Sequence, residues 1–281
     1  MSTWIITGCS TGLGRAFAET ALARGHNVVV TARDVSAVQD LADTHPDTAL
    51  AAALDVTDDT QVQAAVAAAV DRFGAVDVLI NNAGYGYRAA VEEGEDDAVR
   101  QLFDTHVFGT VRMVKAVLPG MRARRSGTIA TLSSIGARVC PEGSGYYAAA
   151  KAATEALTLS LRKEAAPLGI AAMTVEPGAF RTDFAGRSLT QAVTPIDDYA
   201  ETAGKRRKDH DTGHGRQPGD PDKAAAALVD VIDAGDVPYL LALGTDAAAA
   251  VRASLDALHY DLDTFDEVTR STDYDADPAG R

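Results

Sequence analysis

The sequence has few of the residues that mark secreted, metal-binding or nucleic-acid-binding proteins. Only two cysteines occur in 281 residues, which provides neither a disulfide framework nor a metal-ligand cluster and suits a reducing compartment. Lysine and arginine total 26 against 40 aspartates and glutamates, so the formal net charge is −14. This acidic balance argues against a nucleic-acid or anionic-membrane surface. We therefore expect no metal, nucleic-acid or membrane partner.

Long apolar runs are also missing. No uninterrupted apolar stretch reaches the roughly 18 residues of a membrane span, and the first residues lack the basic region and apolar run of a signal peptide. These features favour a cytoplasmic location. Aromatic residues make up only 6% of the chain, but 46% of all residues are hydrophobic, which is enough for a large core.

Short β-branched segments alternate with helical patterns along the chain. The expected strands are residues 4–7, 27–32, 49–56, 76–80, 127–134, 170–176 and 237–243. This alternation predicts an α/β fold, a single-domain doubly wound parallel sheet of about seven strands with helices on both faces. We place that domain at residues 1–245. Residues 246–281 are expected to form a helix to about residue 260 and a mobile acidic tail after about residue 264.

A glycine-rich turn between the first strand and the first helix predicts a dinucleotide site. Glycines permit a tight backbone and the close approach of a pyrophosphate, and the helix N-terminus presents free N–H groups. The candidate residues of this turn are Gly8, Ser10, Thr11, Gly12, Leu13 and Gly14. Ser10 and Thr11 add hydroxyl donors for the phosphate.

The end of the second strand bears on the choice of cofactor. The small Ala32 followed by Arg33 favours NADP(H), because an arginine in this place accommodates a 2′-phosphate. Asp34 keeps NAD(H) open, because an acidic residue here binds the ribose hydroxyls. Arg33 as a solvated loop charge is the alternative.

Tyr147 and Lys151 are four residues apart in a stretch rich in helix formers. On a helix they share a face. A nearby ammonium favours the phenolate and lowers the pKa of a tyrosine from its usual value of about 10. The pair is therefore a candidate proton donor and acceptor. Two fixed letters also arise by chance, so the pair alone is better explained as an incidental pair on a helix surface.

Six motifs in register support the pair. They are Thr7-Gly-x-x-x-Gly-x-Gly14, Asp55-Val56, Asn81-Asn82-Ala83-Gly84, Ser134, Tyr147-x-x-x-Lys151 and Pro177-Gly178-x-x-x-Thr182. In this order they resemble the classical short-chain dehydrogenase/reductase family over residues 3–245. Residues 107–113 and 118–119 further resemble its hydroxysteroid-dehydrogenase-like branch. The resemblance implies a Rossmann fold and a homodimer or homotetramer that pairs through two long helices.

The resemblance implies a catalytic role for each matching residue. Tyr147 would protonate the carbonyl oxygen during reduction or deprotonate the alcohol during oxidation. Lys151 would lower the pKa of the tyrosine and bind the nicotinamide ribose. Ser134 would hydrogen-bond the substrate oxygen, and its neighbour Ser133 fits the register less well.

The resemblance also implies a cofactor site. Asp55 would touch the adenine, Asn81 would support the ribose and the central strand, and Thr182 would hold the carboxamide. The same motifs add Val56, Asn82, Ala83, Gly84, Pro177 and Gly178 to the expected cofactor-binding residues, beside Tyr147 and Lys151.

One position departs from the family pattern. The family has an asparagine in an Asn-x-x-Gly string where this chain has His106-Val-Phe-Gly109. That asparagine helps to hold a water that links the lysine to solvent. Histidine keeps a polar donor and acceptor, is bulkier, and can titrate near neutral pH. Either His106 maintains the water chain, or it retunes the proton relay or protrudes toward the substrate.

The substrate side is less specified. Residues that could line a pocket, or equally belong to the core, are Tyr85, Tyr87, Ile135, Arg138, Cys140, Tyr146, Phe180 and Phe184. Most are apolar or aromatic, which favours a fairly hydrophobic carbonyl or alcohol. Residues 183–218 are mixed in composition, which is typical of a substrate-binding lid. The basic run Lys205–Lys208 within them could meet an anionic substrate or a carrier protein, or be a solvated face.

We therefore predict an NADP(H)-preferring oxidoreductase that interconverts a ketone or aldehyde and an alcohol. An epimerase or dehydratase on the same fold and a non-catalytic cofactor sensor are the alternatives. The complete set of Ser134, Tyr147 and Lys151 argues against a sensor, which has no need of an acid–base pair.

Overall fold

The protein is built on one seven-stranded sheet. The computed structural model describes residues 1–185, 188–208 and 215–274; the rest of the predicted lid and acidic tail lies outside these ranges. The strands are β1 (Thr3–Ile6), β2 (Asn27–Ala32), β3 (Ala49–Ala53), β4 (Val78–Asn81), β6 (Gly127–Leu132), β7 (Ile170–Pro177) and β9 (Leu240–Leu243). They pair in the order β3-β2-β1-β4-β6-β7-β9, and every pair is parallel. The predicted doubly wound sheet is confirmed.

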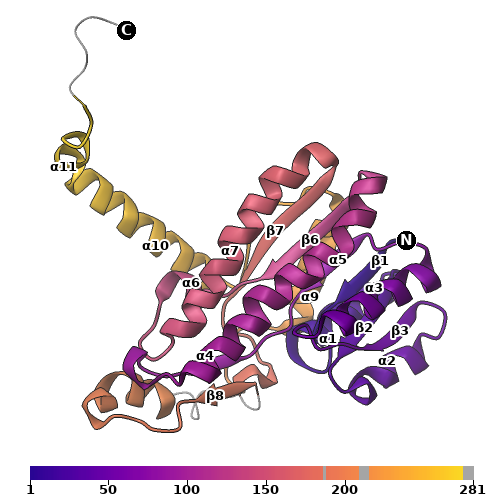
Figure 1. Cartoon of the computed structure of the whole chain (residues 1–281), viewed down its shortest axis with the longest axis horizontal. Helices are drawn as coiled ribbons and strands as arrows, with labels where there is room; N and C mark the ends of the chain where they lie inside the picture. Colours follow the sequence, from indigo (N-terminus) through magenta and orange to yellow (C-terminus); the bar gives the residue numbers. More distant parts are fainter. Residues whose placement is uncertain (186–187, 209–214, 275–281) are drawn as a thin grey trace, which may run out of the picture.

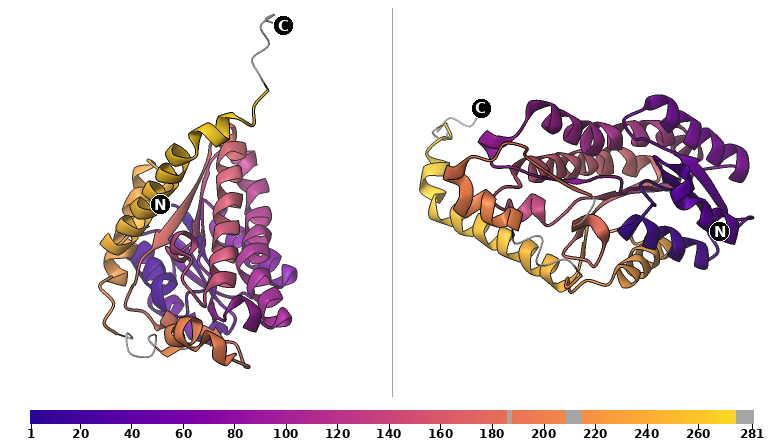
Figure 2. Two further views of the ribbon diagram at one scale, coloured as in Figure 1. Left: turned by 90° about the vertical axis from the view of Figure 1, so that its left-hand side faces the viewer. Right: turned by 90° about the horizontal axis from the view of Figure 1, so that it is seen from below.

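Helices cover both faces of this sheet (Figures 1 and 2). The helices α1 (Gly12–Ala23), α2 (Gln39–Thr44) and α9 (Pro221–Ala234) pack on one face, and α3 (Asp59–Phe73), α5 (Gly109–Arg124) and α7 (Gly145–Ala165) pack on the other. Successive side chains of a strand point to opposite faces. Along β1, Trp4 and Ile6 therefore enter the first core and Ile5 enters the second, and all three are completely buried.

Local signals in the sequence define several helix ends. The carboxylate of Asp58 accepts hydrogen bonds from the N–H groups of Thr60 and Gln61 and so caps α3. Asp220 caps α9 in the same way, with Pro221 in the first position of the helix. Gly74, at a φ of 88°, ends α3 in the left-handed conformation that glycine adopts at little cost.

A widened helical turn joins α4 (Asp96–Phe103) directly to α5. Residues Asp104–Phe108 form a π-helix, and His106 lies in its middle. Single π turns inside α-helices occur frequently at functional sites. The chain therefore runs from α4 into α5 without a break, and the turn orients His106.

A second, two-stranded sheet was not predicted. It pairs β5 (Gly86–Arg88), which follows β4, with β8 (Leu189–Gln191) from the predicted lid. Glu93, buried after β5, accepts hydrogen bonds from the N–H of Ile196 and from Arg207. These contacts hold residues 188–208 beside the carboxyl end of the sheet (Figure 1).

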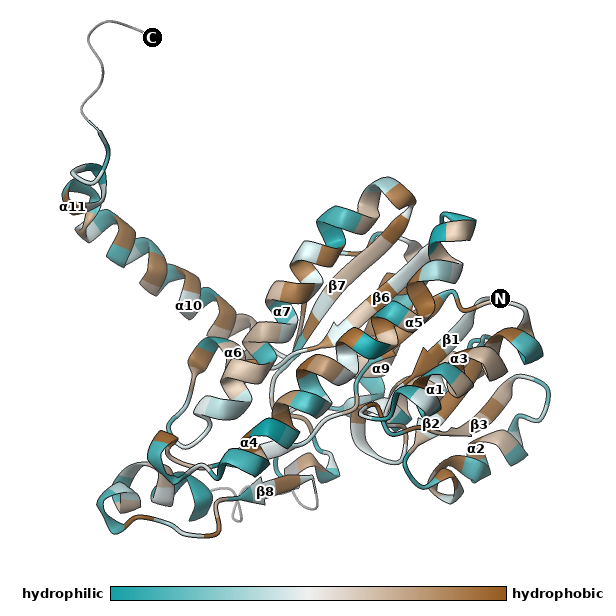
Figure 3. Ribbon diagram, in the orientation of Figure 1, coloured by the Kyte–Doolittle hydropathy of each residue, from teal (hydrophilic) through white to brown (hydrophobic). Residues whose placement is uncertain are grey.

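The C-terminal helices leave the body of the molecule. The helix α10 (Thr245–Thr264) packs at its base on β9 and on α6 (Gly136–Val139), then extends outward into α11 (Asp266–Arg270) (Figures 1 and 3). The helix that was expected to end near residue 260 instead continues to Thr264, and α11 follows it to Arg270. The mobile acidic tail stays a prediction. Residues 275–281 of that tail lie outside the described residues.

Exposed apolar side chains form a row along α10. Leu255, Leu258, Leu262 and Phe265 are each about half exposed or more, at 48%, 57%, 62% and 56%. Their spacing alternates between three and four residues, which is the repeat of a coiled-coil seam. No helix among the described residues combines the length and apolar character needed to cross a membrane.

Candidate active site

Loops after four parallel strands meet at the carboxyl end of the sheet, where ligands bind in open α/β folds. The glycine turn follows β1, residues 82–84 follow β4, Ser133 and Ser134 follow β6, and Gly178 follows β7. A cavity of about 610 Å³ lies here, and Ser134 and Tyr147 line it. This volume suits a small-molecule ligand.

The glycine turn is shaped to receive a phosphate. Gly8 and Gly12 have φ angles of 74° and 64°, and a Cβ on Gly14 would lie 2.3 Å from both the Gly8 oxygen and Asn82 Nδ2. The Thr11 side chain makes no capping hydrogen bond, and the first turn of α1 has no acidic residue. The N–H groups of that turn and the positive end of the helix therefore fit a pyrophosphate.

Asn82 fixes the glycine turn to the end of β4. Its Nδ2 donates to the carbonyl oxygens of Thr7 and Gly8 at 2.8 and 3.1 Å. Thr7 Oγ1 accepts from the N–H groups of Asn82 and Ala83, both at 2.9 Å. The neighbouring Asn81 is 5% exposed, and its Nδ2 has no partner among the described residues. The Asn82 side chain therefore positions the turn, and the Asn81 amide remains available for a ligand.

Of the two charged residues after β2, one is already hydrogen-bonded within the protein and the other is available for a ligand. The Asp34 carboxylate accepts from the N–H and the hydroxyl of Ser36 at 3.0 and 2.7 Å, and these hydrogen bonds lower its pKa. Arg33 is exposed and forms no ion pair within the described part of the chain. Asp55 accepts from the N–H and hydroxyl of Thr57, so its carboxylate shapes the turn after β3.

The loop after β7 lies against the glycine turn and α10. A Cβ on Gly12 would lie 3.4 Å from the Cβ of Thr182, so Thr182 faces the glycine turn. Gly178 approaches Asp246 so closely that a Cβ there would lie 2.1 Å from its Oδ1. Val56, in contrast, is buried in the core below α3.

Lys151 lies buried behind the cavity that Ser134 and Tyr147 line. It is 6% exposed, and its ammonium donates to the carbonyl oxygen of Leu132 at 2.7 Å. Its Nζ is 5.8 Å from the centroid of the Tyr147 ring. Ser134 Oγ accepts from the N–H of Gly136 at 3.0 Å and remains at the cavity wall. The structure thus brings Ser134, Tyr147 and Lys151 together.

Burial governs the protonation of this group. It raises the pKa of Tyr147 to about 12, against smaller opposing effects of the Ser134 hydroxyl and the charge of Arg88. It also lowers the pKa of Lys151 to about 8, against the charge of Glu155. The charge of Arg88 acts to lower the tyrosine pKa, and the Lys151 ammonium donates to Leu132 beside the same ring.

Ser133 points away from the cavity into a buried ionic cluster. Its hydroxyl donates to Glu155, and Arg138 lies 2.9 Å from both Glu155 and the fully buried Glu176. Burial raises the pKa of Glu155 to about 7. Arg138, expected near the substrate, is instead engaged by these carboxylates.

His106 lies between the loop after β4 and Tyr147. It is 2% exposed, its Nε2 lies 3.1 Å from the nitrogen and 2.7 Å from the oxygen of Tyr85, and its Nδ1 has no partner among the described residues. Its ring meets that of Tyr147 edge-on at 5.6 Å. Burial, then the charge of Lys151, lower the pKa of His106 to about 3. Burial therefore opposes the charged form that titration of His106 near neutral pH would require.

Half of the expected pocket residues line the cavity. They are Tyr87, Ile135, Cys140 and Phe184, whereas Tyr85, Arg138, Tyr146 and Phe180 pack elsewhere. Arg88 and Arg206 also line it and were not predicted individually. The basic run around Arg206 was a signal, but the sequence does not show which of its members turns inward.

Comparisons with known proteins agree with this geometry. The family model for short chain dehydrogenases matches residues 2–192. Oxidoreductase BOA17 of Botryotinia fuckeliana is 38% identical over 245 residues, which cover 87% of this chain and 89% of that protein.

Two solved structures extend the likeness. A short-chain dehydrogenase from Streptomyces avermitilis is 42% identical, with a TM-score of 0.90 over 97% of this chain and 100% of that one. The 3-ketoacyl-(acyl-carrier-protein) reductase from Brucella melitensis, complexed with NADH, is 25% identical, with a TM-score of 0.72 over 89% and 98%. On its motifs, fold and relatives, the chain belongs to the short-chain dehydrogenase/reductase family of NAD(P)-dependent oxidoreductases.

Proposed function

We propose that the protein is an NADP(H)-preferring oxidoreductase that interconverts a ketone or aldehyde and an alcohol, with Tyr147 as the general acid and base. The observation that carries this proposal is the shared cavity of Ser134 and Tyr147, with the buried Lys151 behind it. A bound nicotinamide supplies or accepts the hydride. The protein's own residues position the substrate oxygen and move its proton.

Proton transfer follows from the protonation states. With a pKa of about 12, Tyr147 keeps its proton at neutral pH and can donate it to a carbonyl oxygen. Ser134 donates a second hydrogen bond to that oxygen. The neutral His106, whose Nδ1 has no partner in the described part of the chain, takes the place of the family asparagine beside Lys151.

The cofactor preference rests on Arg33 and Asp34. The exposed guanidinium of Arg33 is available for a 2′-phosphate, whereas the Asp34 carboxylate is occupied by Ser36. NADP(H) is therefore the preferred cofactor, and NAD(H) is the weaker one. The Brucella relative is described in complex with NADH, so a comparison of the two cofactors is the decisive measurement.

Residues 183–218 act in this proposal as the substrate-binding lid on the 1–245 domain. Phe184, Leu189 and Arg206 from this segment line the cavity opposite Ser134 and Tyr147. The apolar members favour a substrate with a hydrophobic body. The likeness to hydroxysteroid dehydrogenases stays a prediction.

The protein is further proposed to form a homodimer or homotetramer. The apolar row on α10 supports this, because a single helix projecting into water is marginally stable without a partner. A second copy of the chain provides the same row, as a two-fold interface requires.

Substitution of Tyr147 by Phe removes the acid–base hydroxyl and keeps the ring. We expect kcat for NADPH-dependent carbonyl reduction, followed by absorbance, to fall roughly 10²- to 10⁴-fold. Tyr146→Phe is the matched control, because its hydroxyl bonds to the Val91 carbonyl outside the cavity. Reduction that survives in Tyr147→Phe would contradict the mechanism.

The pH dependence of reduction reports on Lys151. Its ammonium is charged below its pKa of about 8 and neutral above it, whereas Tyr147 stays protonated to about 12. We expect kcat/KM to be flat from about pH 6 and to fall through about pH 8, where the lysine loses its charge. His106→Asn should keep this shape, because His106 is already neutral. A change in kcat/KM between about pH 5 and 7 that is seen in the unsubstituted protein and absent from this variant would show that His106 titrates.

Substitution of Arg33 by Ala should affect the binding of NADPH and NADH differently. We expect the Kd for NADPH to rise roughly 10- to 100-fold, as for the loss of a charged hydrogen bond, and that for NADH to stay nearly unchanged. Binding is measured by fluorescence titration, with the exposed Arg100→Ala as a control. Equal weakening of both cofactors would remove Arg33 from the phosphate site.

Negative charges introduced into the apolar row of α10 test whether this row forms the interface between copies of the chain. The double substitution Leu258→Glu and Leu262→Glu should lower the molar mass measured by sedimentation, because a buried carboxylate opposes association. Val193→Glu adds the same charge at a side chain that is 85% exposed elsewhere and should leave the mass unchanged. An unaltered mass in the double variant would exclude α10 from the interface.

A further inference from the structure

Two arginines face the cavity that holds Tyr147. Arg88 reaches it from the end of β5, and Arg206 reaches it from the helical residues 205–208. The Nε of each guanidinium is buried and has no hydrogen-bond partner among the described residues. Arg88 spends one of its remaining donors on the hydroxyl of Ser144. Both side chains line the cavity, and each has a donor that no described residue accepts.

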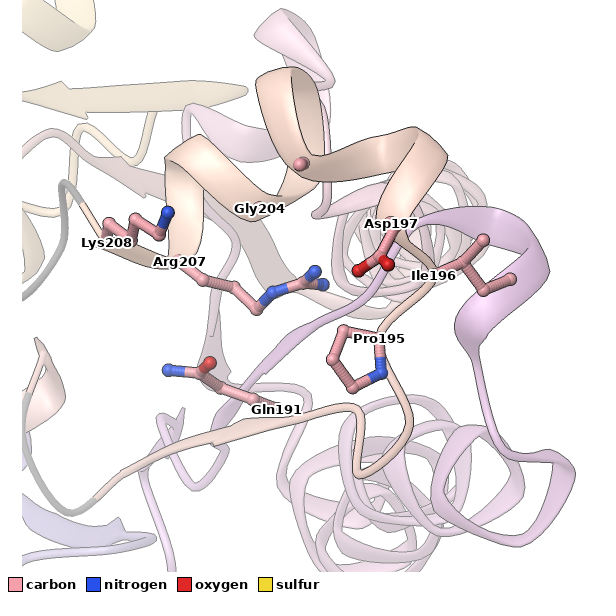
Figure 4. A pocket seen from close by; sticks show the side chains of 8 residues that line it. Gln191, Pro195, Ile196, Asp197, Gly204, Arg207 and Lys208 are labelled. Carbon is pink, nitrogen blue, oxygen red and sulfur yellow. The ribbon is translucent and has the colours of Figure 1, made fainter.

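Two other partly buried arginines among the described residues are paired with carboxylates. Arg207, the next residue, lies 2.6 Å from the fully buried carboxylate of Glu93 and extends into a separate cavity of about 330 Å³ (Figure 4). Arg138 is held by two glutamates. Burial of a cation without a counter-ion is costly. Arg88 and Arg206 form no ion pair with the described residues, so an anionic ligand would supply what they lack.

The two guanidinium groups affect each other. Burial, and then the charge of Arg206, lower the pKa of Arg88 to about 10, so Arg88 remains charged at neutral pH. Their proximity is unfavourable unless an anion lies between them. Glu142 is the carboxylate that lines the same cavity, and its side chain is exposed. The cavity thus has two partly buried positive groups and one exposed negative group.

The basic run in the sequence has different roles along its length. Arg207 is neutralised by Glu93, and Lys205 and Lys208 are exposed. Only Arg206 of this run lines the Tyr147 cavity. The pairing of β8 with β5 places the segment that contains Arg206 at the cavity. Leu189, in β8 of the same segment, also lines the cavity.

We propose that Arg88 and Arg206 form a subsite for the carboxylate of an oxo-acid or hydroxy-acid substrate. Planar guanidinium groups bind a carboxylate by paired hydrogen bonds. The apolar body of the substrate lies against Ile135, Val139 and Leu189. A monovalent carboxylate is favoured over a dianionic phosphate because Glu142 lines the same cavity. This assignment rests on the proposed function, since the carbonyl must reach Ser134 and Tyr147.

The test compares acids with their neutral analogues. Alkyl 4-oxo, 5-oxo and 6-oxo carboxylic acids and their methyl esters are reduced with NADPH, and kcat/KM is measured for each. For the best chain length we expect the acid to exceed its ester by roughly 10-fold or more, the effect of a charge-assisted hydrogen bond. An ester that equals or exceeds its acid at every length overturns the subsite.

Substitutions at Arg88 and Arg206 test whether these residues cause the preference for the acid over its ester. Arg206→Gln and Arg88→Gln should each lower the acid-to-ester ratio roughly 10- to 100-fold, mainly through KM, and Arg206→Lys should restore part of it. Lys205→Gln removes the same charge from the same run outside the cavity and should keep the ratio. A ratio unaffected in both glutamine variants, with thermal unfolding showing that they are folded, overturns the assignment.

A binding measurement separates the subsite from the reaction. Calorimetry with 4-phenylbutanoate and 4-phenylbutanamide, which the enzyme cannot reduce, should show tighter binding of the carboxylate that depends on Arg206. This result without turnover of any oxo acid would support the subsite and contradict the proposed reaction. Equal binding of acid and amide would overturn the subsite even if the esters are reduced.

Discussion

The junction between β1 and β4 is the constraint on which the site depends. The sheet order changes direction there, since β2 and β3 lie to one side of β1, and β4, β6 and β7 lie to the other. The helix after β1 packs on one face and α5 packs on the opposite face, so the loops between them separate and leave a crevice. Hydrogen bonds from Asn82 to Thr7 and Gly8 hold the two strand ends together below it. The absence of a side chain at Gly14 makes room for the Asn82 amide.

Patterns with a fixed period or a fixed spacing were readable in the sequence. The seven strands follow from short apolar runs between helical segments. Ser134, Tyr147 and Lys151 follow from a spacing that one strand, one loop and one helix bring together. Side-chain partners distant in the sequence were not readable. Arg138 was expected at the substrate, but Glu155 and Glu176 engage it from α7 and β7. Neither the residue type of Arg138 nor its position in the sequence indicates that it pairs with these glutamates.

Burial explains the remaining differences between sequence and structure. Histidine has an ordinary pKa near neutrality, so His106 alone predicted a titrating group, and only its enclosure lowers that pKa to about 3. The four residues of the basic run are alike in the sequence but have different surroundings in the structure. Arg206 lines the cavity, Arg207 forms a buried ion pair, and the two lysines are exposed. The same enclosure acts on Tyr147 and Lys151 in opposite directions, because it disfavours the charged form of each.

The π turn at Asp104–Phe108 has a consequence for helix phase. A π turn accommodates one extra residue, and one residue corresponds to about 100° of rotation around an α-helix. The faces of α4 and α5 are therefore offset, so that Leu102 packs in the small cluster around Tyr87 while Met113 packs in the main core under the sheet. One continuous helix can thus serve two separate interiors. His106 lies at the point where the phase changes, between the interior that supports the substrate cavity and the one that supports the sheet.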